Sequence, residues 1–170
     1  MRRSVRDTEF SEYVAGRRRQ LRRTAYLLCG DSHRAEDLVQ TTLMKVYVAW
    51  PRIRTDGGNV DAFARRVMVN AHIDETRRPW RRERVGVEED DLDGVAADTG
   101  EDRDVLLTAL AGLPPRQRAT VVLRHYWGLS VEETARDLRC STGTVKSQTS
   151  HALRRLEAVL SPHYEERNRR

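Results

Sequence analysis

The sequence predicts an all-α fold made of two small helical domains that are joined by an acidic flexible linker. Three observations lead to this prediction. The polar–apolar alternation of strands is absent, and no run of β-branched residues is bounded by turn signals. Apolar residues instead recur three and four positions apart in both halves of the chain. The charges, finally, separate the 170 residues into three blocks.

These charge blocks define the expected domains. Residues 1–84 carry 19 Lys and Arg against 11 Asp and Glu, and residues 105–170 carry 11 against six. Residues 85–104 carry nine acidic side chains and a single arginine. Because this block has too few apolar residues to offset its ordering entropy, we expect a disordered linker. The expected domains are therefore 1–84 and 105–161, and a frayed tail should follow over 162–170.

Two helices should open the first domain. The first spans about residues 8–29 and ends at Gly30. The second begins at a cap near Asp31, and Pro51 should stop it. Each helix has one apolar side. Those sides carry Phe10, Val14, Leu21, Ala25 and Leu28 in the first helix, and Ala35, Leu38, Val39, Thr42, Val46 and Ala49 in the second.

A third helix should complete the first domain. A turn-rich segment, Arg52 to Gly58, precedes it, and the side chain of Asn59 suits its cap. Its inward side is predicted from residues spaced three and four apart, which are Val60, Phe63, Ala64, Val67, Ala71 and Asp74. A basic segment with Arg77 and Arg78 follows, and Pro79 should kink or break the helix there.

The second domain should begin with two helices. A short one ends near Leu113, and Pro114–Pro115 open the next, as proline is well tolerated in a first turn. Gly128 should end this second helix.

A short helix, a tight turn and a longer helix should complete the second domain. Ser130 and Glu133 have the spacing of a capping box, in which each side chain bonds the backbone amide of the other residue. This helix runs to about Arg139, and Ser141 caps the last one, which reaches about Leu160. The buried side of the last helix is predicted to be Val145, Thr149, Ala152, Leu153, Leu156 and Leu160.

This arrangement is typical of a helix-turn-helix that binds DNA. A helix fits the major groove, and small hydroxyl side chains near its start let it approach base edges closely. Longer cationic and amide side chains reach bases or phosphates. From the pattern alone, a plain helical hairpin is the alternative. The outer side chains of the last helix are Lys146, Ser147, Gln148, Ser150, His151, Arg154 and Arg155.

Composition and motifs argue against several other classes of protein. No apolar run approaches the roughly 20 residues of a membrane span, and none follows the first residues as in a secretory signal. Two cysteines, Cys29 and Cys140, are too few for a disulfide framework, and Cys29 with His33 is only half of a metal site. A glycine-rich phosphate loop is absent. We therefore expect a cytoplasmic protein with no metal and no cofactor.

Five motifs in order resemble the extracytoplasmic-function (ECF) RNA polymerase sigma factors of the sigma-70 superfamily, in particular their actinobacterial SigE-type branch. Three resemble sigma region 2: Ala35-Glu36-Asp37-Leu38-Val39-Gln40, Arg66-Val67-Met68-Val69-Asn70, and Ile73-Asp74 with Arg77-Arg78. Two resemble sigma region 4: the stretch from Leu113-Pro114 through Trp127-Gly128-Leu129-Ser130 to Thr134-Ala135, and Gly143-Thr144-Val145-Lys146-Ser147.

The resemblance implies a promoter-specificity subunit of bacterial RNA polymerase that is no enzyme itself. It implies that the second helix docks on core RNA polymerase through Asp37, Gln40 and Thr41. It also implies that the minus-ten element is read as a single strand, with a base flipped into a pocket formed by Ile53 to Asp61 and the third helix. The residues implied at this site are Asn59, Arg65, Arg66, Asn70, Arg77, Arg78 and Trp80.

The last helix and its flank are implied to read the minus-thirty-five element of the promoter DNA. Gln148 and His151 stand where the family often has arginine, so the motif read should differ from that of other members. The polymerase contact, Gln40-Thr41-Thr42-Leu43, lacks a carboxylate and an aromatic of the usual pattern. An anti-sigma factor is a candidate partner. The residues implied to bind this element are Arg124, Thr144, Lys146, Ser147, Gln148, Ser150, His151, Arg154 and Arg155.

Two other functions stay open on the residues alone. One is a stand-alone regulator that binds operators as a dimer through its helix-turn-helix. The other is an RNA-binding or protein-interaction module that uses the arginine-rich first half. Binding to core polymerase separates both from a sigma factor. The acidic linker should permit, but not set, the spacing of two promoter elements, and it either mimics a nucleic-acid strand or only solubilises the chain.

Overall fold

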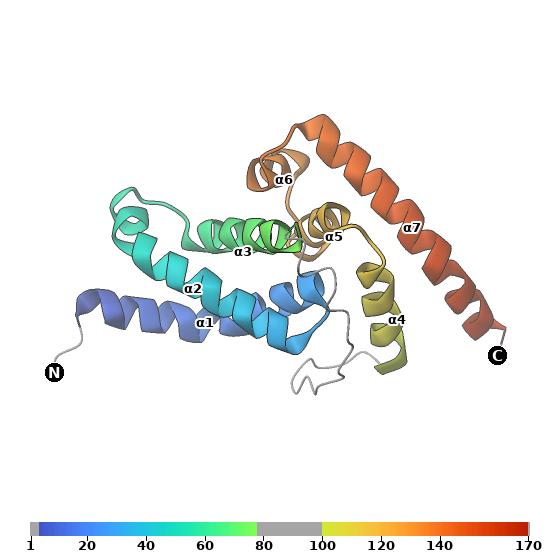
Figure 1. The fold of residues 1–170 in the computed structure, drawn as a ribbon, viewed down its shortest axis with the longest axis horizontal. Helices are drawn as coiled ribbons and strands as arrows, with labels where there is room; N and C mark the ends of the chain where they lie inside the picture. The colour runs from blue at the N-terminus through green and yellow to red at the C-terminus, as the bar shows by residue number, and fades with distance from the viewer. Residues whose placement is uncertain (1–3, 78–99, 170) are drawn as a thin grey trace. The chain divides into compact units, whose positions relative to one another are not determined.

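The structure is a computed structural model that describes residues 4–77 and 100–169. Every regular element within these two ranges is a helix, which confirms the predicted all-α fold (Figure 1). The helices form two compact units. Three helices belong to the first unit and the remainder to the second. Pro79, where a kink was expected, lies outside the described residues.

The first helix, α1 (Val5–Cys29), is bounded by two local signals. Ser4 and Asp7 form a capping box at its start, and Gly30 ends it with a left-handed φ of 70°. The expected end is confirmed. The expected start near residue 8 is wrong by about one turn, because the Ser4 hydroxyl already accepts the Asp7 amide at 3.2 Å.

The second helix, α2 (Ser32–Thr55), runs past the proline that was expected to stop it. Asp31 is its cap, as predicted. Pro51 has no N–H to bond the carbonyl of Tyr47, four residues earlier. The Nη2 of Arg6 on α1 donates to that carbonyl instead. The helix therefore continues for another turn and takes in the first part of the segment that was expected to be a loop.

The third helix, α3 (Val60–Thr76), starts at the predicted cap, and the Asn59 Oδ1 accepts the Ala62 amide at 3.1 Å. The predicted inward side is wrong, since Ala64 alone of those residues is buried. Apolar side chains occur around much of this helix, so their spacing does not select one side. The buried side is Ala64, Met68, Val69, His72 and Ile73.

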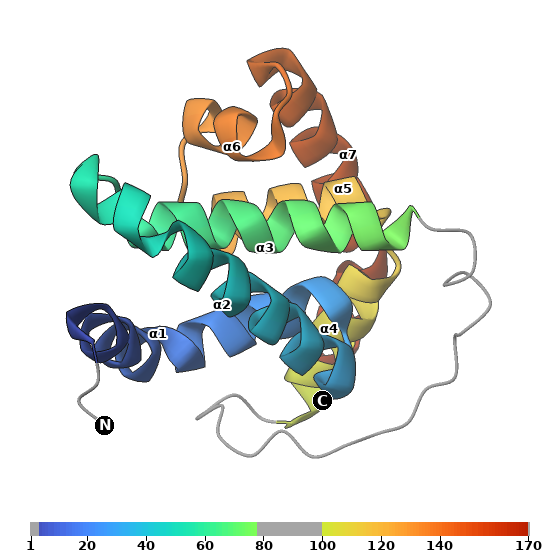
Figure 2. The ribbon, with the colours of Figure 1, turned by 60° about the vertical axis from the view of Figure 1, so that its left-hand side comes forward.

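The core of the first unit is built around α2. This helix packs against both α1 and α3, whereas α1 and α3 share a smaller contact (Figures 1 and 2). At one end, the Phe10 ring lies edge-on to those of Tyr47 and Trp50, with centroids 5.0 and 5.5 Å away. The buried apolar side chains are Leu21, Ala25, Leu28, Ala35, Leu38, Val39, Val46, Trp50, Ile53, Ala64, Met68, Val69 and Ile73.

The second unit is assembled on its last helix, against which three of the others pack. One turn is π-helical, and its wider hydrogen bond joins the Trp127 amide to the Val122 carbonyl at 3.1 Å. Gly128 follows with φ of 66°, as expected for the residue that ends this stretch. The elements are α4 (Gly100–Ala111), α5 (Pro115–Val121), η2 (Val122–Tyr126), α6 (Val131–Leu138) and α7 (Thr142–Asn168).

Two expected boundaries of the second unit are wrong. Residues 100–104 belong to α4 rather than to a disordered linker, and residues 162–168 continue α7 rather than fraying. These two segments hold each other. The Asp102 carboxylate lies 3.4 Å from the His163 Nε2 and also pairs with Arg167. A third expectation fails for Leu153, which is 43% exposed instead of buried.

Candidate nucleic-acid interface

Caps mark the start of both helices of the α6–α7 helix-turn-helix. The Ser130 Oγ accepts the Glu133 amide at 3.0 Å, and the Glu133 carboxylate accepts the Ser130 amide at 2.8 Å. Arg139 ends α6 in the left-handed region with φ of 54°. The Ser141 Oγ then accepts the Thr144 amide at 3.1 Å and starts α7. The predicted capping box and the second cap are both confirmed, so local sequence directs the chain through the turn.

The outer side of α7 presents polar and cationic side chains close to its start. Val145, Ala152 and Leu156 bury the opposite side of the helix. Thr144 and Gln148 are half-buried, and the Thr144 hydroxyl lies 2.9 Å from the Ser141 Oγ. The predicted residues that are exposed are Lys146, Ser147, Ser150, His151, Arg154 and Arg155. This surface has the donors and the small hydroxyls that reading a major groove requires.

Arg124 lies before the turn and is bound to it. The side chain is half-buried, and its Nη1 donates to the Leu129 carbonyl. Its Nε is buried without a hydrogen-bond partner among the described residues. In this structure, Arg124 therefore holds the backbone between Gly128 and Ser130, a role that the sequence did not indicate.

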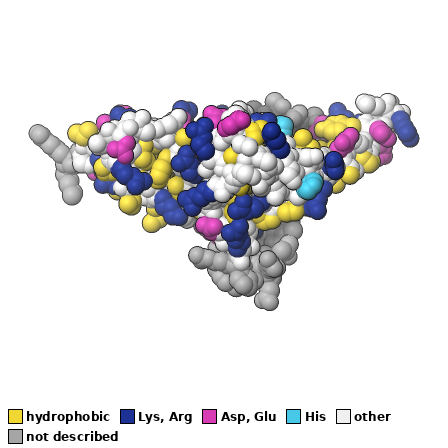
Figure 3. All heavy atoms as spheres, turned by 90° about the horizontal axis from the view of Figure 1, so that it is seen from above, with side chains coloured by type: hydrophobic (Ala, Val, Ile, Leu, Met, Phe, Trp, Pro, Cys, Tyr) yellow, Lys and Arg dark blue, Asp and Glu magenta, His cyan; other side chains and the backbone are white. Residues whose placement is uncertain are grey.

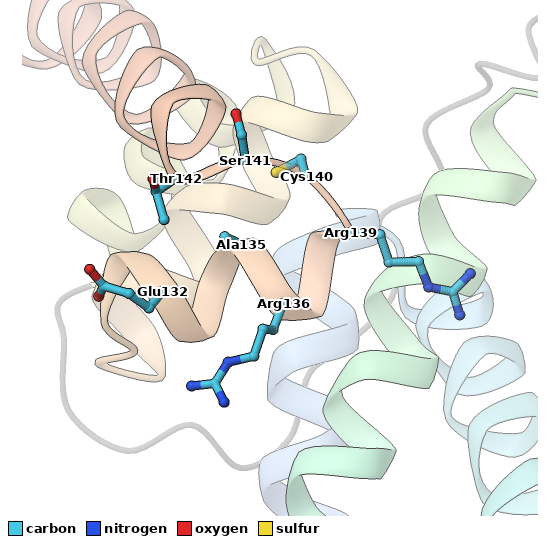
Figure 4. Close-up of a pocket in the computed structure, with 7 residues that line it drawn as sticks. All are labelled: Glu132, Ala135, Arg136, Arg139, Cys140, Ser141 and Thr142. Carbon is cyan, nitrogen blue, oxygen red and sulfur yellow. The ribbon is translucent and has the colours of Figure 1, made fainter.

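A shallow pocket lies beside the turn and has basic edges. Arg136 and Arg139 project from the α6 side of it, and Ser141 and Thr142 lie at the start of α7 (Figure 4). Both arginines are exposed. The sequence analysis did not select them, although two arginines three residues apart at the end of a helix before a recognition helix are a usable signal. In helix-turn-helix proteins, this first helix crosses the DNA backbone.

On the first unit, α3 presents a second polar stripe. Arg66, Asn70 and Arg77 are spaced by four and seven residues and so follow one side of the helix. The Asn70 Nδ2 donates to the Arg66 carbonyl at 2.8 Å. Arg65 lies half-buried beside this stripe, and Asn59 is exposed at the helix start. The other two residues predicted at this site, Arg78 and Trp80, lie outside the described residues.

The outer side of α2 carries the predicted polymerase contacts. Asp37, Gln40 and Thr41 are all exposed along one side of the helix. The same side continues with Met44 and Val48, which are 71% and 76% exposed. Aliphatic side chains this open on a helix are a signal of a partner surface. The sequence analysis did not single out Val48, although its spacing from Asp37, Thr41 and Met44 places it on the side opposite the predicted core.

Charge favours a polyanionic partner for the molecule. The formal net charge is +5, and basic side chains cover more of the face drawn in Figure 3 than acidic ones. Among the residues described, no group of three or more His, Cys, Asp and Glu could hold a metal ion. None of the described helices is long and apolar enough to cross a membrane.

Comparison with known proteins identifies the family that each of the two units matches. Residues 14–82 match the family described as sigma-70 region 2, and residues 103–156 match sigma-70, region 4. A curated relative, the RNA polymerase sigma-E factor of Streptomyces coelicolor, is 43% identical over 159 residues, covering 89% of this chain and 86% of the relative. The ECF RNA polymerase sigma factor SigM of Mycobacterium tuberculosis is 33% identical over 153 residues, covering 89% and 76%.

Solved structures share the fold. The sigma factor RpoE of Bartonella quintana, solved in complex with the anti-sigma factor NepR, matches with a TM-score of 0.69 and 30% identity. That match covers 90% of this chain and 97% of the other. CnrH, solved with the cytosolic domain of CnrY, matches with a TM-score of 0.62 at 21% identity, and this likeness concerns the fold alone.

Proposed function

This chain belongs to the ECF group of RNA polymerase sigma factors. We propose that the exposed sides of three of its helices, α7, α3 and α2, each bind a different partner in promoter recognition. As a sigma factor, it directs promoter-specific transcription initiation by binding core RNA polymerase and the minus-ten and minus-thirty-five elements. The polymerase forms the phosphodiester bonds, so no catalytic residue is proposed. We place its work in the cytoplasm, where polymerase and promoter DNA meet.

The minus-thirty-five element is assigned to α7. Ser147 and Ser150 face the base edges, while Lys146, His151 and Arg154 supply longer donors. Gln148 and Arg155 lie at the margins of the same surface, and Thr144 sits at its start. Phosphates on either side of the groove are assigned to Arg136 and Arg139, next to the pocket at the turn.

The minus-ten element is assigned to the start and the outer side of α3. The amides of Asn59 and Asn70 can each offer a donor and an acceptor to the edge of an unstacked base. The arginines of the same helix suit the backbone of a single strand. They are Arg65, Arg66 and Arg77, with Arg78 and Trp80 following in the sequence.

Core polymerase is assigned to the outer side of α2. Asp37, Gln40 and Thr41 provide the polar contacts, and Met44 with Val48 provides an aliphatic surface next to them. The observation that carries this assignment is the unbroken exposed stripe, which combines one carboxylate with two open aliphatic side chains. A regulator of the anti-sigma class is proposed as a further partner, since RpoE of Bartonella quintana was solved with one.

A binding assay with core polymerase tests the function. Asp37→Ala combined with Gln40→Ala should weaken binding of the full chain to core, because both side chains project from the docking side of α2. Asp74→Asn is the matched control, since Asp74 is an exposed acid on another helix. Equal binding by wild type and the double variant would contradict the α2 assignment. No binding by wild type would instead favour a stand-alone dimeric regulator.

A further inference from the structure

The short connection from α2 to α3 is the part of the proposed minus-ten site with the least packing of its own. Residues 56–59 are all exposed. Gly57 takes a left-handed φ of 66°, and the Gly58 amide bonds back to the Ile53 carbonyl at 2.8 Å. Local hydrogen bonds hold each end of the loop on its own helix, so contacts of α2 and α3 with the rest of the unit set how the two ends lie relative to each other.

The far end of the loop is tied to α1 by an ion pair. The Arg17 Nε donates to the Asp61 Oδ1 at 3.0 Å, and its Nη2 lies 2.8 Å from the Oδ2. Each nitrogen thus meets a different carboxylate oxygen, a bidentate arrangement that constrains orientation as well as distance. Asp61 lies in the first turn of α3, two residues after Asn59.

The near end of the loop is tied to the same stretch of α1. Tyr13, one turn before Arg17, packs on Trp50 in the last part of α2, with ring centroids 5.5 Å apart. Burial raises the pKa of Tyr13, and the negative charge of Asp61 raises it further. Two consecutive turns of α1 thus contact both helices that flank the loop.

We propose that Arg17 is a positioning residue for minus-ten recognition, acting through Asp61 to hold the α2–α3 loop and the start of α3. This rests on the proposed function of that loop. α1 and α3 contact each other less than either contacts α2, and this ion pair is one of the side-chain contacts between them, together with that of Cys29 and His72 at 3.7 Å. Arg17 then affects which base the minus-ten site prefers, although Arg17 itself does not contact the DNA.

The test separates positioning from simple attraction of DNA by charge. Phosphate attraction is independent of sequence, so a lost or gained charge changes affinity for all strands alike. Misplacing Asn59 should instead reduce the preference for the correct strand. The quantity to measure is therefore a ratio of two holoenzyme affinities. The first is the affinity for a DNA single strand selected from a random pool. The second is the affinity for the same strand with the base that selection fixes replaced.

Arg17→Gln and Asp61→Asn should each lower this ratio about threefold to fivefold, the effect of losing an ion pair of this exposure. The charge-swapped double variant, Arg17→Asp with Asp61→Arg, should restore most of it. Arg18→Gln is the matched control, because Arg18 pairs with Glu36 on α2 at 3.2 Å and should leave the ratio unchanged. Binding to core polymerase should stay the same in all variants.

Three results would overturn the proposal. Affinities that change equally for both strands would make Arg17 a direct phosphate contact. An unchanged ratio in both single variants, with a lower ratio in Asn70→Ala, would refute the role of Arg17 while the minus-ten assignment of α3 stands. An unchanged ratio in Asn70→Ala as well would show that the assignment of α3 itself is wrong.

Discussion

Arg6 shows how a side chain from another helix can replace a backbone donor that proline lacks. It supplies the donor that Pro51 withholds from the Tyr47 carbonyl, and its guanidinium carbon lies 3.8 Å from the centre of the Tyr47 ring. The Tyr47 hydroxyl in turn donates to the Asp7 carboxylate at 2.7 Å. This group of three residues joins the first turn of α1 to the last turns of α2, next to the aromatic cluster.

The hydrogen bond between Tyr47 and Asp7 should make the first turns of α1 sensitive to pH. It lowers the pKa of Asp7 below 3.8 and raises that of Tyr47 above 10.0. The stabilisation is therefore lost when the pH falls through the lowered pKa of Asp7. It is also lost when the pH rises through the raised pKa of Tyr47. Tyr47→Phe should reduce amide-exchange protection of α1 at pH 7 but have less effect at pH 3. An equal loss at both pH values would contradict the role of this bond.

Lys146 and Ser147 are neighbours on α7 with separable roles. Lys146→Ala should weaken binding to minus-thirty-five duplex for all sequences, and it should reduce the salt slope by about one. Ser147→Ala should leave the slope unchanged and alter the preferred base, since a hydroxyl contacts an edge rather than a phosphate. Lys45→Ala, which removes the other lysine of the chain, is the control for charge. A changed slope in Ser147→Ala would refute this division.

At the scale of elements, α7 serves two purposes. Its first half carries the proposed reading surface, and its second half packs against α4 through the Asp102 ion pairs. The caps at Ser130 and Ser141 set where each helix of the turn begins, and the Arg124 side chain braces the backbone between α5–η2 and α6. The proposed DNA contacts and the packing against α4 therefore reside in different segments of α7.

This separation predicts a variant that loosens the unit but still binds DNA. Asp102→Asn removes the charge that holds His163 and Arg167, which should cost about 0.5–1 kcal/mol of local stability. Amide exchange of α4 and of the end of α7 should become faster, while affinity for minus-thirty-five duplex stays unchanged. Asp104→Asn is the control, because Asp104 is exposed on the same helix. Equal effects of both variants would mean that general charge, not the ion pairs, is responsible.

At the scale of the whole molecule, the chain has two compact units, to which the proposed function assigns two promoter elements along one stretch of DNA. Residues 78–99 join them and could reach at most about 75 Å if fully extended. This covalent reach allows many separations of the two elements. The core polymerase must therefore impose the one that is used.

Changing the promoter spacing tests this conclusion. Inserting about five base pairs, half a turn of DNA, rotates the minus-thirty-five element to the opposite side of the duplex. Transcription by the holoenzyme should then fall to the level of a promoter without that element. Binding of the full chain alone to the minus-thirty-five duplex should not depend on spacing. Holoenzyme activity that tolerates the insertion would show that polymerase does not impose a single separation.

Local signals account for the parts of the fold that were predicted correctly. Gly30, Asn59 and Ser141 act within one turn of the chain, so their effect can be seen in the sequence itself. Two of the failures occur where a distant residue intervenes. Pro51 should end α2 on local grounds, but Arg6 replaces the missing donor. By sequence, residues 100–104 resemble part of a disordered acidic segment, but the Asp102 carboxylate contacts His163 and Arg167 on α7.

In the proposed sites, too, features set by local spacing were predictable and contacts between distant residues were not. The exposure of Lys146, Ser147 and Ser150 was predictable, because a regular apolar stripe placed them opposite the core. The bidentate pair of Arg17 and Asp61 was not, since it joins residues 44 positions apart.

The sequence by itself determined the helical fold class, the two charged halves, the caps and the motifs of a sigma factor. All of these depend on composition or on spacing within a few turns. Only the tertiary structure decided which side of α3 is buried, how far α2 and α7 extend, and which arginines brace loops. These outcomes depend on donors, acceptors and opposite charges that meet only after the helices have packed.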